Sequence, residues 1–160
     1  KSRNRDLASQ NEQLKLRNQQ LESDMTAAPA PVATTLGGFQ AESRGGEIVV
    51  NLPSDVLFDS GRDTLKSTAK TSLNAVATAI KSEYPSKSIR LIGFTDTDPI
   101  KKSGYKSNWH LAFDRAWAVR DELVAKGIGK DRIALESYGP TRPRATKEAS
   151  RRVEIVVVTD

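Results

Sequence analysis

The N-terminal 25 residues show a seven-residue repeat of apolar and polar positions. They are rich in Gln, Asn and charged residues and contain no Gly, Pro or aromatic residue. The repeat places each leucine three positions after an asparagine, in the pairs Asn4 and Leu7, Asn11 and Leu14, and Asn18 and Leu21. Leucine at d and asparagine at a are typical of a two-stranded parallel coiled coil, which the asparagines weaken. We therefore expect residues 1–25 to form a coiled-coil helix that pairs two copies of the chain; a single solvated helix or a disordered segment is the alternative.

A stretch of small residues follows this predicted helix. Residues 26–38 read TAAPAPVATTLGG, with two prolines and a terminal glycine pair. Such a composition is typical of a semi-extended linker. We expect the linker to end at Gly38 and the folded domain to occupy residues 39–160.

The rest of the chain shows the periodicities of strands and helices in turn. The pair Gly45 and Gly46 separates two short β-like runs and supplies the positive φ of a hairpin turn. Apolar residues three or four apart predict two amphipathic helices, the first after a cap at Asp63 or Thr64 and the second ending at Gly127. The expected elements are strands at 39–43, 47–52, 89–94, 132–138 and 151–158 and helices at 64–83 and 108–126. Their order, β-β-α-β-α-β-β, predicts an α+β fold in which a mixed sheet carries both long helices on one face.

The second long helix carries polar residues just outside its apolar face. With about 100° per residue, Asn108 and Arg115 fall together beyond one edge of an apolar arc of about 160°. Asp96 follows the end of the preceding strand, and we expect Asn108 and Arg115 to face it. On the residues alone, a structural ion pair between Asp96 and Arg115 is the simpler interpretation.

Three aromatic residues of the same helix lie inside the apolar arc. They are Trp109, Phe113 and Trp117, spaced four residues apart. We expect them to belong to the core rather than to a sugar-stacking surface.

Composition limits the class of protein. The chain has 160 residues, of which 37% are hydrophobic, which suits one domain with an additional segment. It contains no run of about 18 apolar residues that could span a bilayer. Because it begins at Lys1 without a charged and apolar leader, we expect membrane attachment only through a missing upstream anchor. The absence of cysteine excludes disulfides, thiolate zinc sites and cysteine nucleophiles.

We expect no enzymatic activity, no cofactor and no metal. His110 is the only histidine, and no G-x-S-x-G nucleophile turn accompanies it. A metal site would depend on carboxylates, and Asp96 and Asp98 supply two ligands where a hard cation takes about six or more oxygens. The same two residues are a weak match to a glycosidase pair, because aspartates are common in turns.

The net charge leaves a polyanion as an alternative class of partner. Lys and Arg outnumber Asp and Glu by 25 to 20, which gives a net charge of +5. A basic cluster near the C-terminus, Arg142, Arg144, Arg151 and Arg152, would be its contact surface. No RNA-binding aromatic strand or zinc module accompanies these arginines, so nucleic acid is not the expected partner.

Four motifs and a short entry sequence follow one another between residues 47 and 158. The motifs are Gly93-Phe94-Thr95-Asp96, the helix start Ser107-Asn108-Trp109-His110-Leu111-Ala112-Phe113-Asp114-Arg115-Ala116, the pair Tyr138-Gly139 and the run Arg151-Arg152-Val153-Glu154-Ile155; the entry is Leu57-Phe58-Asp59-Ser60-Gly61. In this order and spacing they resemble the OmpA-like peptidoglycan-binding domain, which implies that family's β-α-β-α-β-β fold. The loop from Asp96 to Trp109 is most similar to the motility protein B branch, the flagellar stator subunit that grips the cell wall. The chain departs from the family pattern at Phe94, Ala112 and Ser150.

The resemblance implies non-covalent binding of peptidoglycan through the diaminopimelate residue of its stem peptide. The free end of that residue carries an ammonium and a carboxylate. Asp96 matches the family aspartate that receives the ammonium, and Arg115 matches the family arginine that forks onto the carboxylate. The other matched pocket positions are Thr95, Asn108, Leu111, Arg151, Phe58 and Asp59.

The resemblance also implies a place in the cell envelope. We expect a periplasmic domain of a Gram-negative-type bacterium, held at the outer or inner membrane by an upstream anchor. A general envelope anchor is favoured over a flagellar stator subunit, because the likeness to the stator branch rests on one loop.

Overall fold

The chain divides into two units, Lys1–Val32 and Ala33–Asp160, which are described separately. The computed structural model describes residues 2–26, 32–101 and 104–159. Within these ranges, no helix combines the length and the apolar character that crossing a bilayer requires.

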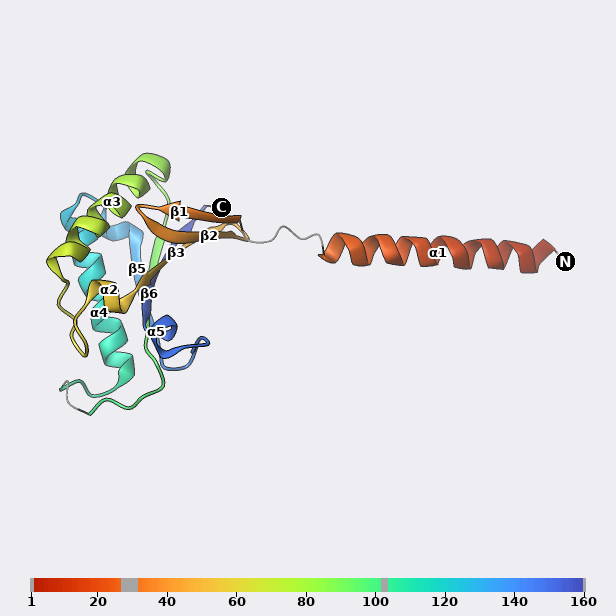
Figure 1. The fold of residues 1–160 in the computed structure, drawn as a ribbon. Coiled ribbons are helices and arrows are strands. Elements are labelled where there is room, and N and C mark those ends of the chain that lie inside the picture. The colour runs from red at the N-terminus through yellow and green to blue at the C-terminus, as the bar shows by residue number, and fades with distance from the viewer. Residues whose placement is uncertain (1, 27–31, 102–103, 160) are drawn as a thin grey trace. The chain divides into compact units, whose positions relative to one another are not determined.

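The N-terminal unit contains one helix, α1 (Ser2–Thr26), as the heptad pattern predicts (Figure 1). Leu7, Leu14 and Leu21 are all more than half exposed, at 53%, 58% and 53%. A helix whose leucines are exposed in this way is only marginally stable in water. Pairing of two copies through these leucines stays a prediction.

The predicted linker is wrong for the second half of residues 26–38. Val32–Leu36 form strand β1, which pairs with β2 (Phe39–Arg44). The glycines at 37–38 have φ of 59° and 88° and form the turn between the two strands. The glycine pair is thus a hairpin turn, because both residues adopt the left-handed backbone that glycine permits. Residues 27–31 of the predicted linker lie outside the described residues.

The second unit is built on a six-stranded mixed sheet in the order β1-β2-β3-β6-β4-β5, which confirms the predicted sheet and adds β1 to it. β6 lies between β3 and β4 and is antiparallel to both, whereas β5 is parallel to β4 and forms one edge. The strands that follow β2 are β3 (Glu47–Pro53), β4 (Ile89–Phe94), β5 (Ile133–Gly139) and β6 (Arg152–Val158).

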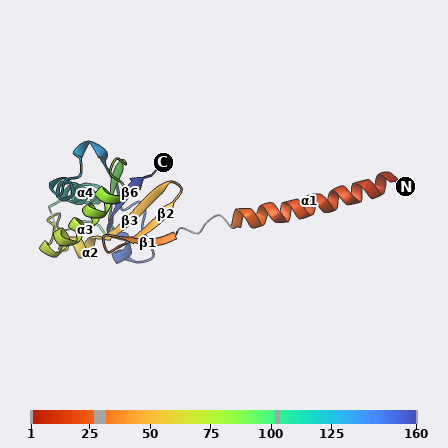
Figure 2. The ribbon, with the colours of Figure 1, turned by 90° about the horizontal axis from the view of Figure 1, so that it is seen from above.

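Two long helices, α3 (Ser67–Glu83) and α4 (Asn108–Ala125), pack on one face of the sheet, as predicted (Figures 1 and 2). The predicted caps at Asp63 or Thr64 are wrong, since α3 begins later. Its N-cap is Lys66, which makes no side-chain capping bond. The core between the helices and the sheet includes Leu73, Val76 and Ile80 of α3, Val119 and Leu123 of α4, and Leu91, Val153 and Ile155 of the sheet.

Three short helical turns complete the fold. They are α2 (Ser54–Leu57), the 3-10 turn η1 (Lys130–Arg132) and α5 (Lys147–Ser150). α2 follows β3 directly, and the backbone N–H of Ser54 donates to the carbonyl of Arg151 over 2.9 Å. This bond holds α2 beside the start of β6.

The aromatic residues of α4 are exposed, so their assignment to the core is wrong. Trp109, Phe113 and Trp117 are 44%, 38% and 46% exposed. α4 packs against β5, the edge strand of the sheet, and the Trp109 ring lies against Gly139 of that strand. The guanidinium of Arg120 lies over the Trp117 ring at 4.9 Å from the ring centre. The periodicity correctly identifies the apolar face of α4, but it does not indicate where the sheet beneath the helix ends.

The sheet and helix approach each other closely at Gly93 of β4. A Cβ atom at this position would overlap the backbone carbonyl of Ala112 in α4. Ala112 is fully buried. Three residues further along the chain from Gly93 and Ala112 are Asp96 and Arg115, respectively. The close contact therefore brings the end of β4 and the second turn of α4 together.

We predict that Gly93→Ala lowers the free energy of unfolding by about 3 kcal/mol, because the added methyl forces β4 and α4 apart. Gly129→Ala is the matched control, since its new Cβ would lie 3.6 Å from Cδ of Arg132 and its φ is −61°. Urea unfolding followed by circular dichroism measures both variants. Equal midpoints for the two would contradict the close approach.

Candidate functional site

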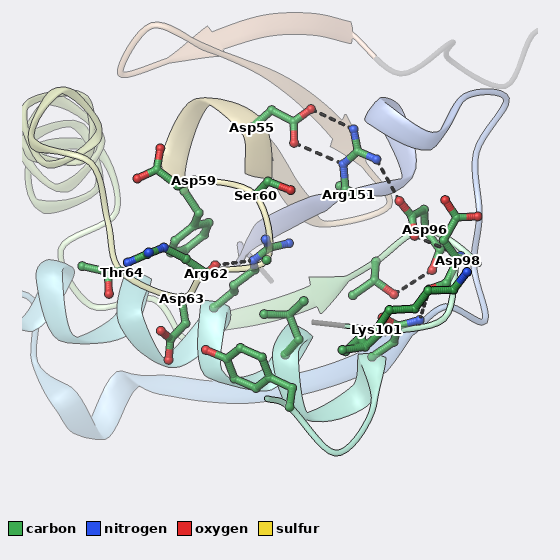
Figure 3. Close-up of a pocket in the computed structure, with 18 of the residues that line it drawn as sticks. Asp55, Asp59, Ser60, Arg62, Asp63, Thr64, Asp96, Asp98, Lys101 and Arg151 are labelled. Atoms are coloured by element: carbon green, nitrogen blue, oxygen red, sulfur yellow. Dashed lines mark hydrogen bonds and ion pairs between the residues drawn. The ribbon is translucent and has the colours of Figure 1, made fainter. Parts of the chain in front are cut away.

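An open groove lies where β4 leaves the core, with a volume of about 1360 Å³ (Figure 3). It lies between the loop 58–66, the loop 95–101 and the first turns of α4, with Arg151 at the start of β6. All eight predicted site residues line it: Phe58, Asp59, Thr95, Asp96, Asn108, Leu111, Arg115 and Arg151. Their assembly in one groove is a finding, whereas their role in binding stays a prediction.

Asp96 is held by the turn that follows β4. The backbone N–H of Thr95 donates to the carbonyl of Gly139 over 2.9 Å and so continues the pairing with β5. The Thr95 hydroxyl, in a residue that is 3% exposed, donates to the Asp96 carbonyl over 2.8 Å. Oδ1 of Asp96 accepts from the backbone N–H of Asp98 over 3.0 Å. Backbone bonds therefore fix the chain at residues 95 and 96, and one backbone N–H holds Oδ1 of the carboxylate.

The second oxygen of Asp96 is paired with Arg151 (Figure 3). Nη1 of Arg151 donates to Oδ2 of Asp96 over 2.8 Å. Nε and Nη2 of the same guanidinium donate to the two oxygens of Asp55 over 3.1 and 3.0 Å. Hydrogen bonds to Asp55 and Asp96 raise the pKa of Arg151 above its ordinary value. One cation is thus shared by two carboxylates.

Asp55 is a groove residue that the sequence reasoning missed. It lies in α2, and the hydrogen bond from Arg151 holds the pKa of its carboxyl below the ordinary value. The two residues are 96 positions apart in the chain. The only sequence signal is that Asp55 precedes the entry motif at Leu57 by two residues, which does not indicate a contact with β6.

Arg115 is a buried cation in the lining of the groove. It is 4% exposed, and its Nε donates to the carbonyl of Arg62 over 2.9 Å. Its guanidinium carbon lies 5.3 Å from the centre of the Phe58 ring. No ion pair joins it to any acid in residues 2–26, 32–101 or 104–159, and burial lowers its pKa. A buried cation of this kind favours an anion entering the groove.

The remaining walls are held by bonds between loops. Nδ2 of Asn108 donates to the carbonyl of Asp98 over 2.9 Å, which ties the first turn of α4 to the loop after β4. Burial, together with a hydrogen bond to Asp63, raises the pKa of Tyr105 to about 12. Leu111 is 6% exposed and supplies apolar wall.

The departures from the family pattern lie outside the groove lining. Phe94 belongs to a second apolar cluster and stacks on Tyr138 with ring centres 5.6 Å apart. Ala112 faces Gly93, as described above. The Ser150 hydroxyl donates to the carbonyl of Thr146 over 2.7 Å. These three side chains act in packing and local bonding behind the groove.

The C-terminal arginines do not form one continuous cationic surface. Arg151 lies in the groove with its two carboxylates. Arg144 and Arg152 both pair with Glu154, at 2.9 Å each. Arg142 lies over the Tyr138 ring at 3.8 Å. Since three of the four arginines share acidic partners, the arrangement does not favour a phosphate backbone as ligand.

Comparison of this chain with profiles of known protein families identifies its family. The profile of the OmpA family matches residues 57–154, which include α3, β4, α4, β5 and the first three residues of β6. The chain belongs to the OmpA family. The resemblance seen in the motifs is therefore confirmed at the level of the family.

Individual proteins are similar to this chain in sequence or in structure. The probable lipoprotein YiaD of Escherichia coli K12 is 34% identical over 75% of this chain, and the chain spans 55% of that lipoprotein's length. The periplasmic domain of Helicobacter pylori MotB superposes with a TM-score of 0.74 at 29% identity, covering 81% of this chain and 88% of that domain. The cell wall anchor of the type VI secretion system of Pseudomonas aeruginosa gives 0.69 at 27% identity, covering 88% and 94%.

Family membership also decides the class of protein. This is a domain of the binding and anchoring type and not an enzyme. In the described part of the chain, no three histidine or acidic side chains are placed to share a metal ion.

We predict a pH-dependent contribution of Asp55 to stability. Its pKa in the folded state lies below the ordinary value of 3.8, so its pairing with Arg151 stabilises the fold above that pH and is lost as the pH falls through the folded-state pKa. The difference in thermal midpoint between the parent and Asp55→Asn should be constant above about pH 5 and shrink below about pH 4. An unchanged difference at about pH 3 would contradict this account.

Proposed function

We propose that this domain binds peptidoglycan non-covalently and anchors an envelope protein to the cell wall. The observation that carries the proposal is the buried guanidinium of Arg115, which lines an open groove and has no ion-pair partner among the described residues. The similar fold of a cell wall anchor from Pseudomonas aeruginosa supports it.

The ligand group that suits the groove is the free end of diaminopimelate in the stem peptide. Its carboxylate would accept hydrogen bonds from the Nη atoms of Arg115, in the bidentate geometry that guanidinium favours. Its ammonium would donate to Asp96, which offers further lone pairs beside those taken by Arg151 and Asp98. We propose as further contacts Phe58, Asp59, Thr95, Asn108, Leu111 and Arg151.

The same chemistry predicts selectivity between wall types. Lysine at this position of the stem peptide keeps the ammonium but lacks the second carboxylate. Arg115 would then stay buried without a carboxylate to accept from its Nη atoms, at a cost of roughly 1–3 kcal/mol. Diaminopimelate should therefore be preferred over lysine.

We further propose an envelope location and a paired state. The domain would act in the periplasm, with membrane attachment supplied by an upstream anchor. Leu7, Leu14 and Leu21 would pair two copies through α1. Two domains on one dimer would bind a polymeric wall with higher avidity than one domain alone.

A flagellar stator subunit is the second candidate for the whole protein. The specific observation in its favour is the superposition on the periplasmic domain of MotB, with a TM-score of 0.74. The likeness to a probable lipoprotein favours the general envelope anchor. Both candidates use the same groove for the wall.

We predict that the purified chain sediments with insoluble sacculi of the diaminopimelate type, and that Asp96→Asn and Arg115→Gln both abolish binding. The control variants are Asp121→Asn and Arg120→Gln, which alter an exposed ion pair of 3.1 Å on the same helix. Circular dichroism of each variant verifies folding. The control variants should bind as the parent does.

Two results would count against the proposal. A folded parent that stays in the supernatant would show that the groove does not bind the wall. Equal binding to diaminopimelate and lysine sacculi would show that Arg115 does not read the second carboxylate.

We predict that the chain is dimeric and that deletion of residues 1–25 makes it monomeric. The reason is that the heptad leucines lie only in this segment. Sedimentation velocity of both forms measures the change. A dimer that persists after the deletion would move the contact to the second unit.

A further inference from the structure

We infer that Asp55 is a positioning residue that makes the groove selective for an ammonium group, by supplying the net negative charge that the pair of Asp96 and Arg151 lacks. This inference rests on the proposed function, since it concerns the ammonium of the same ligand. It assigns a role to a residue outside the predicted set.

The charges around Asp96 must be counted together. Asp96 and Arg151 form an ion pair of 2.8 Å, so these two alone sum to zero. Asp55 binds the same guanidinium at 3.0 Å and makes the sum of the three groups −1. Asp98 does not change this sum, because Lys147 pairs with it at 2.8 Å. The three groups linked through Arg151 therefore carry a net negative charge, which attracts a cationic ligand, only when Asp55 is present.

The geometry of Arg151 also depends on Asp55. A guanidinium prefers to bind a carboxylate with two parallel hydrogen bonds. In this structure Asp55 takes that bidentate position through Nε and Nη2, and Asp96 receives only Nη1. Without Asp55, Arg151 would be free to turn its two-bonded edge onto Asp96. The carboxylate would then have fewer lone pairs left for the ligand.

The backbone fixes Asp55 in this position. The N–H of Ser54 donates to the carbonyl of Arg151, so the residue before Asp55 is bonded to the residue that Asp55 binds. The N–H of Phe58 donates to the carbonyl of Ser54 over 2.7 Å and closes the turn of α2. The nearest competitor for Arg151 is Glu148 at 3.8 Å, which is 72% exposed and therefore a weak partner.

The inference is tested with two soluble peptides. One is the stem tripeptide that ends in diaminopimelate, and the other is the same tripeptide with the side-chain amine acetylated, which removes the positive charge and keeps the carboxylate. Isothermal titration calorimetry measures both with the parent. We expect the parent to bind the free-amine peptide about tenfold or more tightly than the acetylated peptide.

Asp55→Asn should lose this preference and bind the acetylated peptide as the parent does. Asp55→Glu keeps the charge and should retain most of the preference. Asp131→Asn, an exposed acid in η1, is the control and should behave as the parent. The ratio of the two affinities is the readout, because general damage to the groove would weaken both peptides alike.

The remaining outcomes distinguish failure of the role of Asp55 from failure of the proposed binding of peptidoglycan. If Asp55→Asn weakens both peptides equally, or leaves the preference intact, the inference is overturned while the proposed function stands. If the parent binds neither peptide, the proposed function fails and the inference fails with it.

Discussion

The close contact between β4 and α4 at Gly93 and Ala112 is the constraint on which the groove depends. Three residues beyond this contact the strand presents Asp96 and the helix presents Arg115. Neither backbone can shift without opening the core, so packing sets the spacing of these two opposite charges rather than their attraction. The two residues accordingly bind other groups: Asp96 pairs with Arg151, and Arg115 donates to a backbone carbonyl. A groove that is to hold an ammonium and a carboxylate together needs this separation, because acids and bases in direct contact neutralise each other.

The two ends of the groove are prepared to different degrees. Asp96 is paired with Arg151, whereas Arg115 is buried, donates to the backbone carbonyl of Arg62 and pairs with no acid among the described residues. A buried charge without a partner costs several kcal/mol, and a ligand carboxylate would offset part of that cost. The carboxylate end is therefore the source of affinity in the proposed function. The ammonium end, where Arg151 competes with the ligand, determines which cations are accepted.

Sequence reasoning recovers what periodicity and motif order encode. The two long helices and the strands after residue 39 follow from local apolar spacing, and the motifs bring eight residues into one groove. Strand β1 is missed, because Val32–Leu36 consist mainly of small residues, as linkers do. Trp109 is wrongly assigned to the core, since a helical wheel carries no information on where the sheet ends. Asp55 is missed because its contact with Arg151 spans 96 positions and leaves no local pattern.

The departures from the family pattern fall at packing positions and not at the charged positions of the groove. Phe94 packs between Tyr138 and the guanidinium of Arg152, which lies 3.8 Å from its ring centre, and Ala112 completes the contact with Gly93. A change at such a position is tolerated when the neighbours fill the same space. The charges of the groove have no such freedom, because each carboxylate or guanidinium lost leaves a partner unpaired. What the groove binds must therefore be argued from the charges of Arg115 and the groups around Asp96, and not from the residues packed behind them.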